Sequence, residues 1–340
     1  MKEAALTCPA LSAPHFDPGR NAWILSRYSD VQAAFHDANL WPVAPDGTGI
    51  PDEEARIEQA RIRMRAFAAF PQAKLARWEP EFEAFAKKLT TAQPPGHIVD
   101  AASEFAFPWA LEVALRVTGA NPSQKQSLAL LAAAVTAGTA SPDDAVLKKS
   151  AAEANQQLDE ALSACAPPMA GATFVALSQT LPCVLANGWF LLLSHPQSLE
   201  QLRTDSKLLP RAVEELLRLA GLPSVLHRRA MATVEIGDVL IERGDRVDLI
   251  VDAANHDLSS FPSGENFDLD AADSRPAHFA LGAGQHSCAA GSLLRMTIGV
   301  ATKAFLESFE PPEKPSAPVE WRGGSAFRWR SAVFALRRST

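Results

Sequence analysis

The chain has 340 residues, of which 47% are apolar and 21% charged, and its formal net charge is −7. This composition is ordinary for a globular protein able to bury a large core, and the negative charge argues against a general nucleic-acid-binding protein. No linker-like stretch interrupts the sequence, so we predict a single domain over residues 1–340.

The positions of the cysteines and of the apolar stretches indicate whether disulfides, metal sites or membrane spans are expected. The cysteines are widely scattered and form no Cys-x-x-Cys pair, so neither a disulfide framework nor a zinc site is predicted: Cys8, Cys165, Cys183 and Cys288. The N-terminal residues lack the hydrophobic core of a signal peptide. The longest apolar stretch, 169–193, is broken by polar residues and Pro182, which favours a buried core helix over a membrane span. We therefore expect a cytoplasmic protein that does not bind membranes.

The first half of the chain predicts one strand followed by helices. Residues 22–26 are typical of a strand, and Ser29 then caps a short helix through Leu40. A strong helix follows over 52–70, because acidic residues at its start and arginines toward its end suit the helix dipole. Further helices are expected, two of them rich in alanine and the last apolar: 123–137, 143–164 and 172–193.

The second half predicts an amphipathic helix and several strands. The helix covers 208–220, and its i, i+3 spacing places Glu215 and Arg218 on one face as an ion pair. Short strands follow, the first two joined by a Gly-Asp turn that is typical of a hairpin: 233–236, 239–241 and 319–336.

A glycine loop within 277–295 is the main candidate for chemistry. Gly282 and Gly284 allow backbone angles closed to other residues and let the main chain lie close against a flat object. The sequence becomes helical after Cys288, so its thiol would lie near a helix N-terminus, which favours a thiolate. Such a thiolate is a metal ligand or a nucleophile, and a nucleophile needs a base, for which His286 has no obvious orienting partner. A buried structural cysteine is the alternative.

The run Leu281-Gly282-Ala283-Gly284-Gln285-His286-Ser287-Cys288 resembles the haem-binding loop of the cytochrome P450 monooxygenases, whose pattern is Phe-Gly-x-Gly-x-His/Arg-x-Cys-x-Gly. Both glycines, the histidine and the cysteine match, whereas Leu281 replaces the phenylalanine and Ala290 the last glycine. Weaker signals follow the order of the soluble bacterial members over about 23–336. The resemblance implies a mainly α fold with small β-sheets, shortened at the N-terminus and in the two helices that roof the substrate pocket.

The resemblance also implies haem b as cofactor, with its iron bound by Cys288. The family has a His-x-x-x-Arg helix that contacts a haem propionate, and alignment puts Gln59 and Arg63 in those places. Arg228 aligns with a second propionate-binding arginine. Arg63 taken alone is more typical of a solvated helix charge, although an arginine matches carboxylate geometry. The cysteine loop completes the implied cofactor contacts: Gly282, Gly284 and His286.

The apolar central helix departs from the family at the implied catalytic position. Residues 176–180 align with the pattern Ala/Gly-Gly-x-Asp/Glu-Thr, keeping Thr180 but placing Leu177 at the glycine and Gln179 at the acid. In the family the glycine leaves room for oxygen and substrate, while the acid and threonine relay protons. Gln179 cannot replace the acid directly. The alternative is that Gln179 and Thr180 are polar core residues bonding their own backbone.

A structural cluster is implied as well. Glu215 and Arg218 take the place of the family's structural ion pair. Ala271 falls where a third residue, commonly arginine, completes that cluster, and Arg275 is the candidate replacement.

The implied function is a monooxygenase that inserts one oxygen atom from O2 into a small organic substrate. Its electrons would come from a ferredoxin and a ferredoxin reductase, and the cofactor would carry the chemistry. Two alternatives stay open: a haem-thiolate enzyme that uses peroxide, and a haem-binding protein without catalysis.

Overall fold

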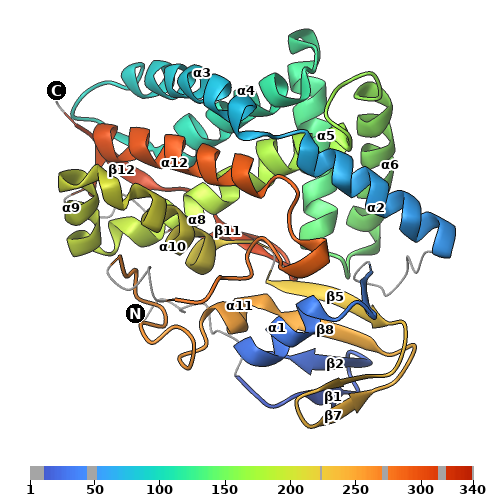
Figure 1. Ribbon diagram of the computed structural model, residues 1–340. Coiled ribbons are helices and arrows are strands. Elements are labelled where there is room, and N and C mark those ends of the chain that lie inside the picture. Colours follow the sequence, from blue (N-terminus) through green and yellow to red (C-terminus); the bar gives the residue numbers. More distant parts are fainter. Residues whose placement is uncertain (1–10, 44–51, 223, 270–274, 313–318, 339–340) are drawn as a thin grey trace. The chain divides into compact units, whose positions relative to one another are not determined.

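The computed structural model describes residues 11–43, 52–222, 224–269, 275–312 and 319–338 (Figure 1). The chain divides into two compact units, each built from two separate stretches. The sheet unit contains Met1–Arg56 and Leu217–Cys288, and the helical unit contains Ile57–Leu216 and Ala289–Thr340. The division into compact units does not test the single domain expected over residues 1–340, which stays a prediction.

The sheet unit is built on a five-stranded sheet with the order β1-β2-β8-β5-β3. Its strands are β1 (His15–Asp17), β2 (Ala22–Leu25), β3 (Leu40–Pro42), β5 (Val225–Ala230) and β8 (Arg246–Ile250). Strand β2 runs parallel to β8, and the other neighbours are antiparallel. The hairpin β6 (Val234–Ile236) and β7 (Val239–Ile241) confirms the predicted Gly-Asp turn.

Besides its strands, the sheet unit has two helices that position the predicted cysteine loop. They are α1 (Tyr28–His36) and α11 (Val251–Asn255). Strand and helix side chains share one buried core, which includes Leu25, Val31, Phe35 and Leu249. Because apolar residues alternate along β5 and β8, one face of the sheet enters this core while polar residues such as Asp248 lie on the other.

The start of α1 corrects one prediction. Ser29 does not cap the helix, because α1 begins one residue earlier and its N-cap residue is Arg27. The amide of Tyr28 instead donates to Asp257 Oδ2 at 2.8 Å, so a carboxylate from a distant segment satisfies this helix end. The helix also ends before Leu40, which already pairs in β3.

The helical unit carries most of the helices. They are α2 (Glu53–Ala68, whose first turn belongs to the sheet unit), α3 (Gln72–Thr91), α4 (Phe107–Thr118), α5 (Lys125–Ala140), α6 (Ala145–Ala161), α7 (Ala170–Val175), α8 (Leu181–Leu193), α9 (Pro196–Thr204), α10 (Leu209–Ala220, which continues into the sheet unit) and α12 (Gly291–Ser308). Its small sheets are β4 (Ile98–Asp100), β12 (Phe334–Arg337) and β9 (Phe309–Glu310), and the hairpin β10 (Trp321–Gly323) with β11 (Arg328–Arg330). A mainly helical fold with small sheets is therefore confirmed.

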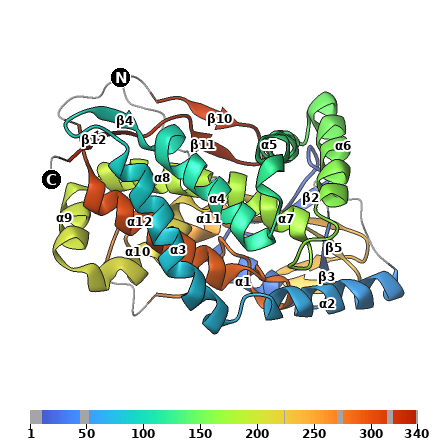
Figure 2. The same ribbon diagram turned by 90° about the horizontal axis from the view of Figure 1, so that it is seen from above.

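Stacked aromatic rings form the core of the helical unit. Trp189 of α8 lies between Phe305 at 4.5 Å and Phe105 at 5.4 Å between ring centroids, and its indole N–H donates to Thr302. Helices α3 and α12 lie side by side (Figure 2) and are joined by an ion pair between Glu83 and Lys303. The predicted apolar helix thus contributes Trp189 to a buried aromatic stack.

The central helix is continuous over Ala170–Leu193 but contains one π-helical turn, Ala176–Thr180, between α7 and α8. The amide of Leu181 donates to Ala176 O five residues back, and the next residue, Pro182, has no N–H with which to continue an α-helical pattern. By length and composition this helix is a candidate membrane span, the single one in the described ranges, and 61% of its most apolar window is buried.

Candidate functional site

The cysteine loop follows a short buried segment of the sheet unit. The amide of Gly282 donates to Phe279 O at 2.8 Å, and the amide of Cys288 donates to Leu281 O at 2.7 Å. These bonds close the loop, and Cys288 at its end forms no disulfide and is half-buried. Helix α12 begins at Gly291, so the expected helix start directly after the cysteine is confirmed.

The second loop glycine is required by a close approach of backbone to backbone. Gly284 has φ of +62°, and a Cβ at this position would lie 2.2 Å from the carbonyl oxygen of Phe35. Any side chain would therefore push the loop away from the end of α1. The sequence predicted that this glycine lets the loop backbone lie close against a flat object. Within the sheet unit, the backbone that Gly284 approaches is the end of helix α1 at Phe35 and His36.

Aromatic packing and a buried amide hold the segment that leads into the loop. The ring of Phe279 stacks on Tyr28 at 4.6 Å and lies 5.1 Å from Phe35 between centroids. The amide of Phe279 donates to Asn255 Oδ1 at 2.7 Å, and the carbonyl of Asn255 accepts from Arg218 at 2.9 Å. A chain of bonds thus connects the buried guanidinium of Arg218 to the loop entrance.

The structural cluster around Arg218 differs from a simple ion pair. Arg218 is 3% exposed, donates to Gly264 O at 2.7 Å and lies over the ring of Phe261 at 5.0 Å. Arg275 pairs with Asp268 and Ser263, at 2.5 and 2.8 Å. Both arginines therefore anchor the segment before the cysteine loop. Ala271 lies outside the described residues, and the pairing of Arg218 with Glu215 stays a prediction.

Four of the predicted cofactor-binding residues lie in the same unit as Cys288, namely Gly282, Gly284, Arg228 and His286. Arg228 of β5 is 4% exposed; its guanidinium lies 5.3 Å from the ring centroid of Phe35 and donates to the carbonyl of His227 at 2.9 Å. Because Gly284 also packs on Phe35, the structure brings Arg228 and the cysteine loop to the same helix end. His286 lies within the loop as a 3₁₀ turn residue.

The remaining predicted residues lie in the helical unit. On α2, Arg63 is half-buried with its guanidinium 5.7 Å from the ring centroid of Phe67, whereas Gln59 is exposed. In the π turn, Gln179 and Thr180 are half-buried, whereas Leu177 is 1% exposed. Leu177 therefore packs into the core, whereas Thr180 is partly exposed. The roles assigned to these residues stay predictions.

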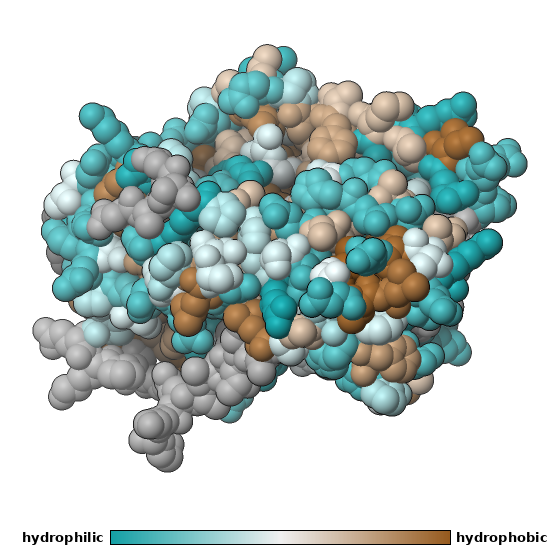
Figure 3. All heavy atoms as spheres, turned by 60° about the horizontal axis from the view of Figure 1, so that its bottom comes forward, coloured by the Kyte–Doolittle hydropathy of each residue, from teal (hydrophilic) through white to brown (hydrophobic). Residues whose placement is uncertain are grey.

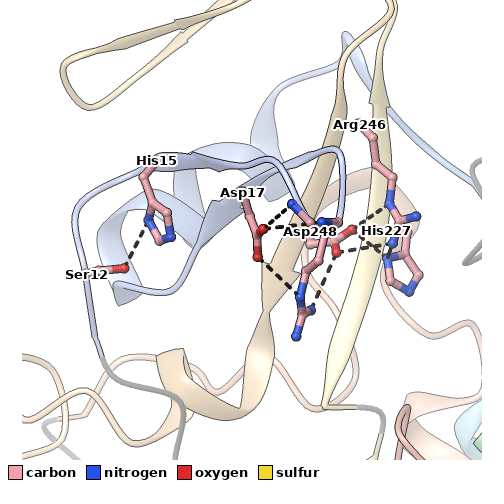
Figure 4. A network of polar contacts seen from close by, with 8 residues as sticks. Ser12, His15, Asp17, His227, Arg246 and Asp248 are labelled. Atoms are coloured by element: carbon pink, nitrogen blue, oxygen red, sulfur yellow. Dashed lines mark hydrogen bonds and ion pairs between the residues drawn. The ribbon is translucent and has the colours of Figure 1, made fainter.

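Sequence reasoning missed a buried charge network on the other face of the sheet (Figure 4). Asp248 of β8 is 0% exposed and accepts from His227 Nδ1 at 2.7 Å and Arg246 Nε at 2.9 Å, with Arg20 at 3.8 Å. Burial acts to raise the pKa of Asp248, but the hydrogen bonds from His227 and Arg246 outweigh it and hold the pKa below its ordinary value. Because His227 precedes Arg228, this network fixes the strand that carries a predicted cofactor residue.

Comparison with known proteins shows the family. The family model "Cytochrome P450" matches residues 144–321. Cytochrome P450-SU2 of Streptomyces griseolus is 28% identical to this chain, covering 90% of the chain and 84% of that protein. The mycinamicin VIII C21 methyl hydroxylase of Micromonospora griseorubida is 26% identical over 83% of the chain and 81% of that protein.

Solved structures agree on the fold. The crystal structure of the cytochrome P450 enzyme CYP109B1 from Bacillus subtilis matches with a TM-score of 0.80 and 21% identity, over 95% of each chain. A mainly helical enzyme with a cysteine loop entering a long helix is the class that fold and site define. The chain belongs to the cytochrome P450 family, and it is an enzyme of the P450 monooxygenase class.

Proposed function

We propose that this enzyme inserts one oxygen atom from O2 into a small organic substrate in the cytoplasm, with electrons from a ferredoxin and its reductase. The proposal rests on the cysteine loop, in which half-buried Cys288 forms no disulfide and ends a turn closed by its own amide. A single soft thiolate in such a loop suits an iron ligand. The loop chemistry therefore supports haem b as the cofactor.

The donor set of the sheet unit fits a haem. Cys288 would bind the iron, and Arg228 and His286, near the same helix end, would hold the propionates by hydrogen bonds, charge-assisted in the case of Arg228. Gly282 would let the loop backbone lie against the macrocycle, and Arg63 with Gln59 are the propionate contacts that the family alignment adds. When bound, the haem supplies the redox centre at which oxygen is activated.

Proton delivery is where this enzyme departs from the family pattern. Gln179 is a neutral amide and has no proton to give at neutral pH. The hydroxyl of Thr180, an ordered water or the substrate itself therefore carries the protons that the family acid would supply. Positioned proton transfer contributes about 10²–10⁴-fold in rate, so the missing acid bears directly on coupling between electron use and product formation.

Gln179 also favours a second candidate function, the use of peroxide as oxidant. Peroxide brings its own protons and electrons, so an enzyme that uses it has less need of an acid at the position of Gln179. A peroxide-using P450 is the alternative that this amide supports.

Replacing Gln179 with Glu separates the two functions. If O2 is the oxidant, Gln179→Glu is expected to raise the fraction of electrons recovered as product, because it restores a positioned proton donor, whereas peroxide-supported turnover changes little. Product and reduced-cofactor consumption are measured under both conditions with a ligand confirmed by its spectral shift. Gln126→Glu on the exposed side of α5 is the matched control. Full coupling in the wild type that Gln179→Glu leaves unchanged would contradict a limiting role for the missing acid.

A further inference from the structure

We infer that Trp41 is a positioning residue that fixes the ring of His286 toward a haem propionate. The inference rests on the proposed haem site and adds to it a residue outside the family's cysteine-loop pattern. Its basis is a stack of three side chains within the sheet unit: Arg56, Trp41 and His286.

The stack has the geometry of a specific aromatic contact. The ring centroids of Trp41 and His286 are 4.9 Å apart with the planes at 79°, which is an edge-to-face arrangement. On the same indole, the guanidinium carbon of Arg56 lies 5.8 Å from the ring centroid, within cation–π distance. The imidazole therefore meets a large half-buried ring that is itself contacted by a cation.

The backbone holds Trp41 in register with the strand of Arg228. In the antiparallel pair of β3 and β5, Trp41 lies opposite Arg229 and Pro42 opposite Arg228, and the amide of Val43 donates to His227 O at 3.3 Å. Leu40, the residue before Trp41, is buried in the core of the unit. Strand pairing thus determines where the indole lies relative to Arg228.

The loop side of the contact is fixed as well. Gly284 seats the loop on the carbonyl of Phe35, two residues before His286. With both backbones held, the imidazole can still rotate about χ1 and χ2, and χ2 is broad for histidine. The edge of Trp41 limits that rotation, and a donor held in its binding orientation loses less entropy when it meets a carboxylate.

The test compares haem release from four proteins: wild type, Trp41→Leu, Trp41→Phe and the control Trp23→Phe. Trp23 is a second tryptophan of the same sheet, in contact with Phe16 and Asp245. Transfer of ferric haem to an excess of apomyoglobin gives the rate. Because edge-to-face pairs contribute about 0.5–1.5 kcal/mol, Trp41→Leu is expected to release haem roughly 2- to 12-fold faster. Trp41→Phe keeps an aromatic edge and is expected to stay near wild type, as is Trp23→Phe.

A double-mutant cycle shows whether Trp41 acts through His286. In a His286→Ala background, Trp41→Leu is expected to change the release rate by less than about twofold, because the ring it positions is absent. In the haem-free protein, the NMR signal of the His286 ring, identified by its loss in His286→Ala, is expected to shift in Trp41→Leu and not in Trp23→Phe.

The outcomes separate this inference from the proposed function. Wild-type release from Trp41→Leu, or an equal acceleration with and without His286, overturns the role of Trp41 while leaving haem binding intact. An unshifted His286 signal in Trp41→Leu overturns it too. A wild-type protein that takes up no haem overturns the proposed function, and this inference with it. If Trp41→Leu fails to fold by circular dichroism, Trp41→Phe decides: accelerated release that His286→Ala does not abolish contradicts the inference.

Discussion

At the scale of single residues, Asp248 shows how this chain keeps a charge inside the protein. A buried carboxylate is costly unless its partners replace the lost water, and breaking such an arrangement leaves unpaired charge. Here the imidazole of His227 and the guanidinium of Arg246 both bond the carboxylate, and the guanidinium of Arg20 lies 3.8 Å from it. The network stabilises the strand that carries Arg228.

Asp248→Asn is therefore expected to destabilise the protein by about 3–5 kcal/mol at neutral pH, since it removes the buried anion that Arg246 and His227 bond. The pKa of Asp248 is lowered in the folded state, so its contribution is present above the unfolded value, about 3.9, and is lost as pH falls through the folded pKa. Denaturant unfolding from pH 7 toward pH 3 should show the two proteins converging. A constant difference across this range would contradict the assignment.

Asp17→Asn is the control for this change. Asp17 lies in the same network as a partner of Arg20, but its side chain is 36% exposed. Exposed ion pairs contribute about 1 kcal/mol or less, so this variant should lie close to the wild type at every pH.

Some residues of the site can be predicted from the sequence, and others cannot. The cysteine loop could be predicted because Gly282, Gly284, His286 and Cys288 act within a few positions of one another. The network of Asp248 could not, because its partner His227 lies 21 positions away and meets it only through strand register. Trp41 was missed for the same reason: its contact with His286 depends on where β3 pairs.

At the scale of elements, proline marks both π turns of the helical unit. The turn Ala102–Ala106 precedes Phe107-Pro108, and the turn Ala176–Thr180 precedes Leu181-Pro182. In each case the residue before proline donates to a carbonyl five residues back, because the proline itself cannot donate. The sequence thus contained a local signal for the turn that carries Gln179 and Thr180, although periodicity alone predicted an unbroken helix.

The C-terminal hairpin is tied to the turn between α5 and α6 by contacts that no local pattern indicates. Ala326 N donates to Ala140 O at 3.0 Å, and Ser325 Oγ donates to Asp143 at 2.8 Å. At the base of the hairpin, the side chain of Asn187 bonds the backbone of both Arg328 and Arg330, at 3.1 and 2.9 Å. The hairpin is therefore clamped at its tip and at its base.

Gly324→Ala tests the clamp at the tip. A Cβ here would lie 2.1 Å from Ser141 Oγ and 2.5 Å from Ala140 O, so the hairpin tip must move away. We expect a loss of about 1–3 kcal/mol and faster amide hydrogen exchange in the turn at 141–144. In contrast, Gly299→Ala in α12 meets its nearest atom at 3.6 Å and should stabilise by up to about 1 kcal/mol. Equal effects of the two substitutions would show that the close approach at Gly324 has no consequence.

At the scale of the whole molecule, the order of elements was predicted better than their ends. The helices, the hairpin of β6 and β7 and the final strands occur where the sequence placed them, because each rests on its own periodicity or turn. The division into two compact units was not expected, since each unit joins stretches far apart in the chain. Apolar residues form separate patches on the mainly hydrophilic face in Figure 3, as is normal for a globular protein.

Cys288 is the side chain that links the family membership to the proposed chemistry. The relatives and the solved structures establish a P450 fold, and Cys288, which forms no disulfide and ends the closed loop, is the proposed iron ligand. The proposed oxidation depends on that thiolate more than on any other group.

The most direct measurement is the absorption spectrum of the reduced protein under carbon monoxide, for wild type, Cys288→Ala and Cys165→Ala. A thiolate-ligated haem should give the wild type the band near the wavelength that names the family. Cys165 is a free thiol of the helical unit and serves as the control. The account predicts that Cys165→Ala keeps the band and Cys288→Ala loses it. A Cys288→Ala protein that retains the band would contradict the assignment of Cys288 as the haem ligand.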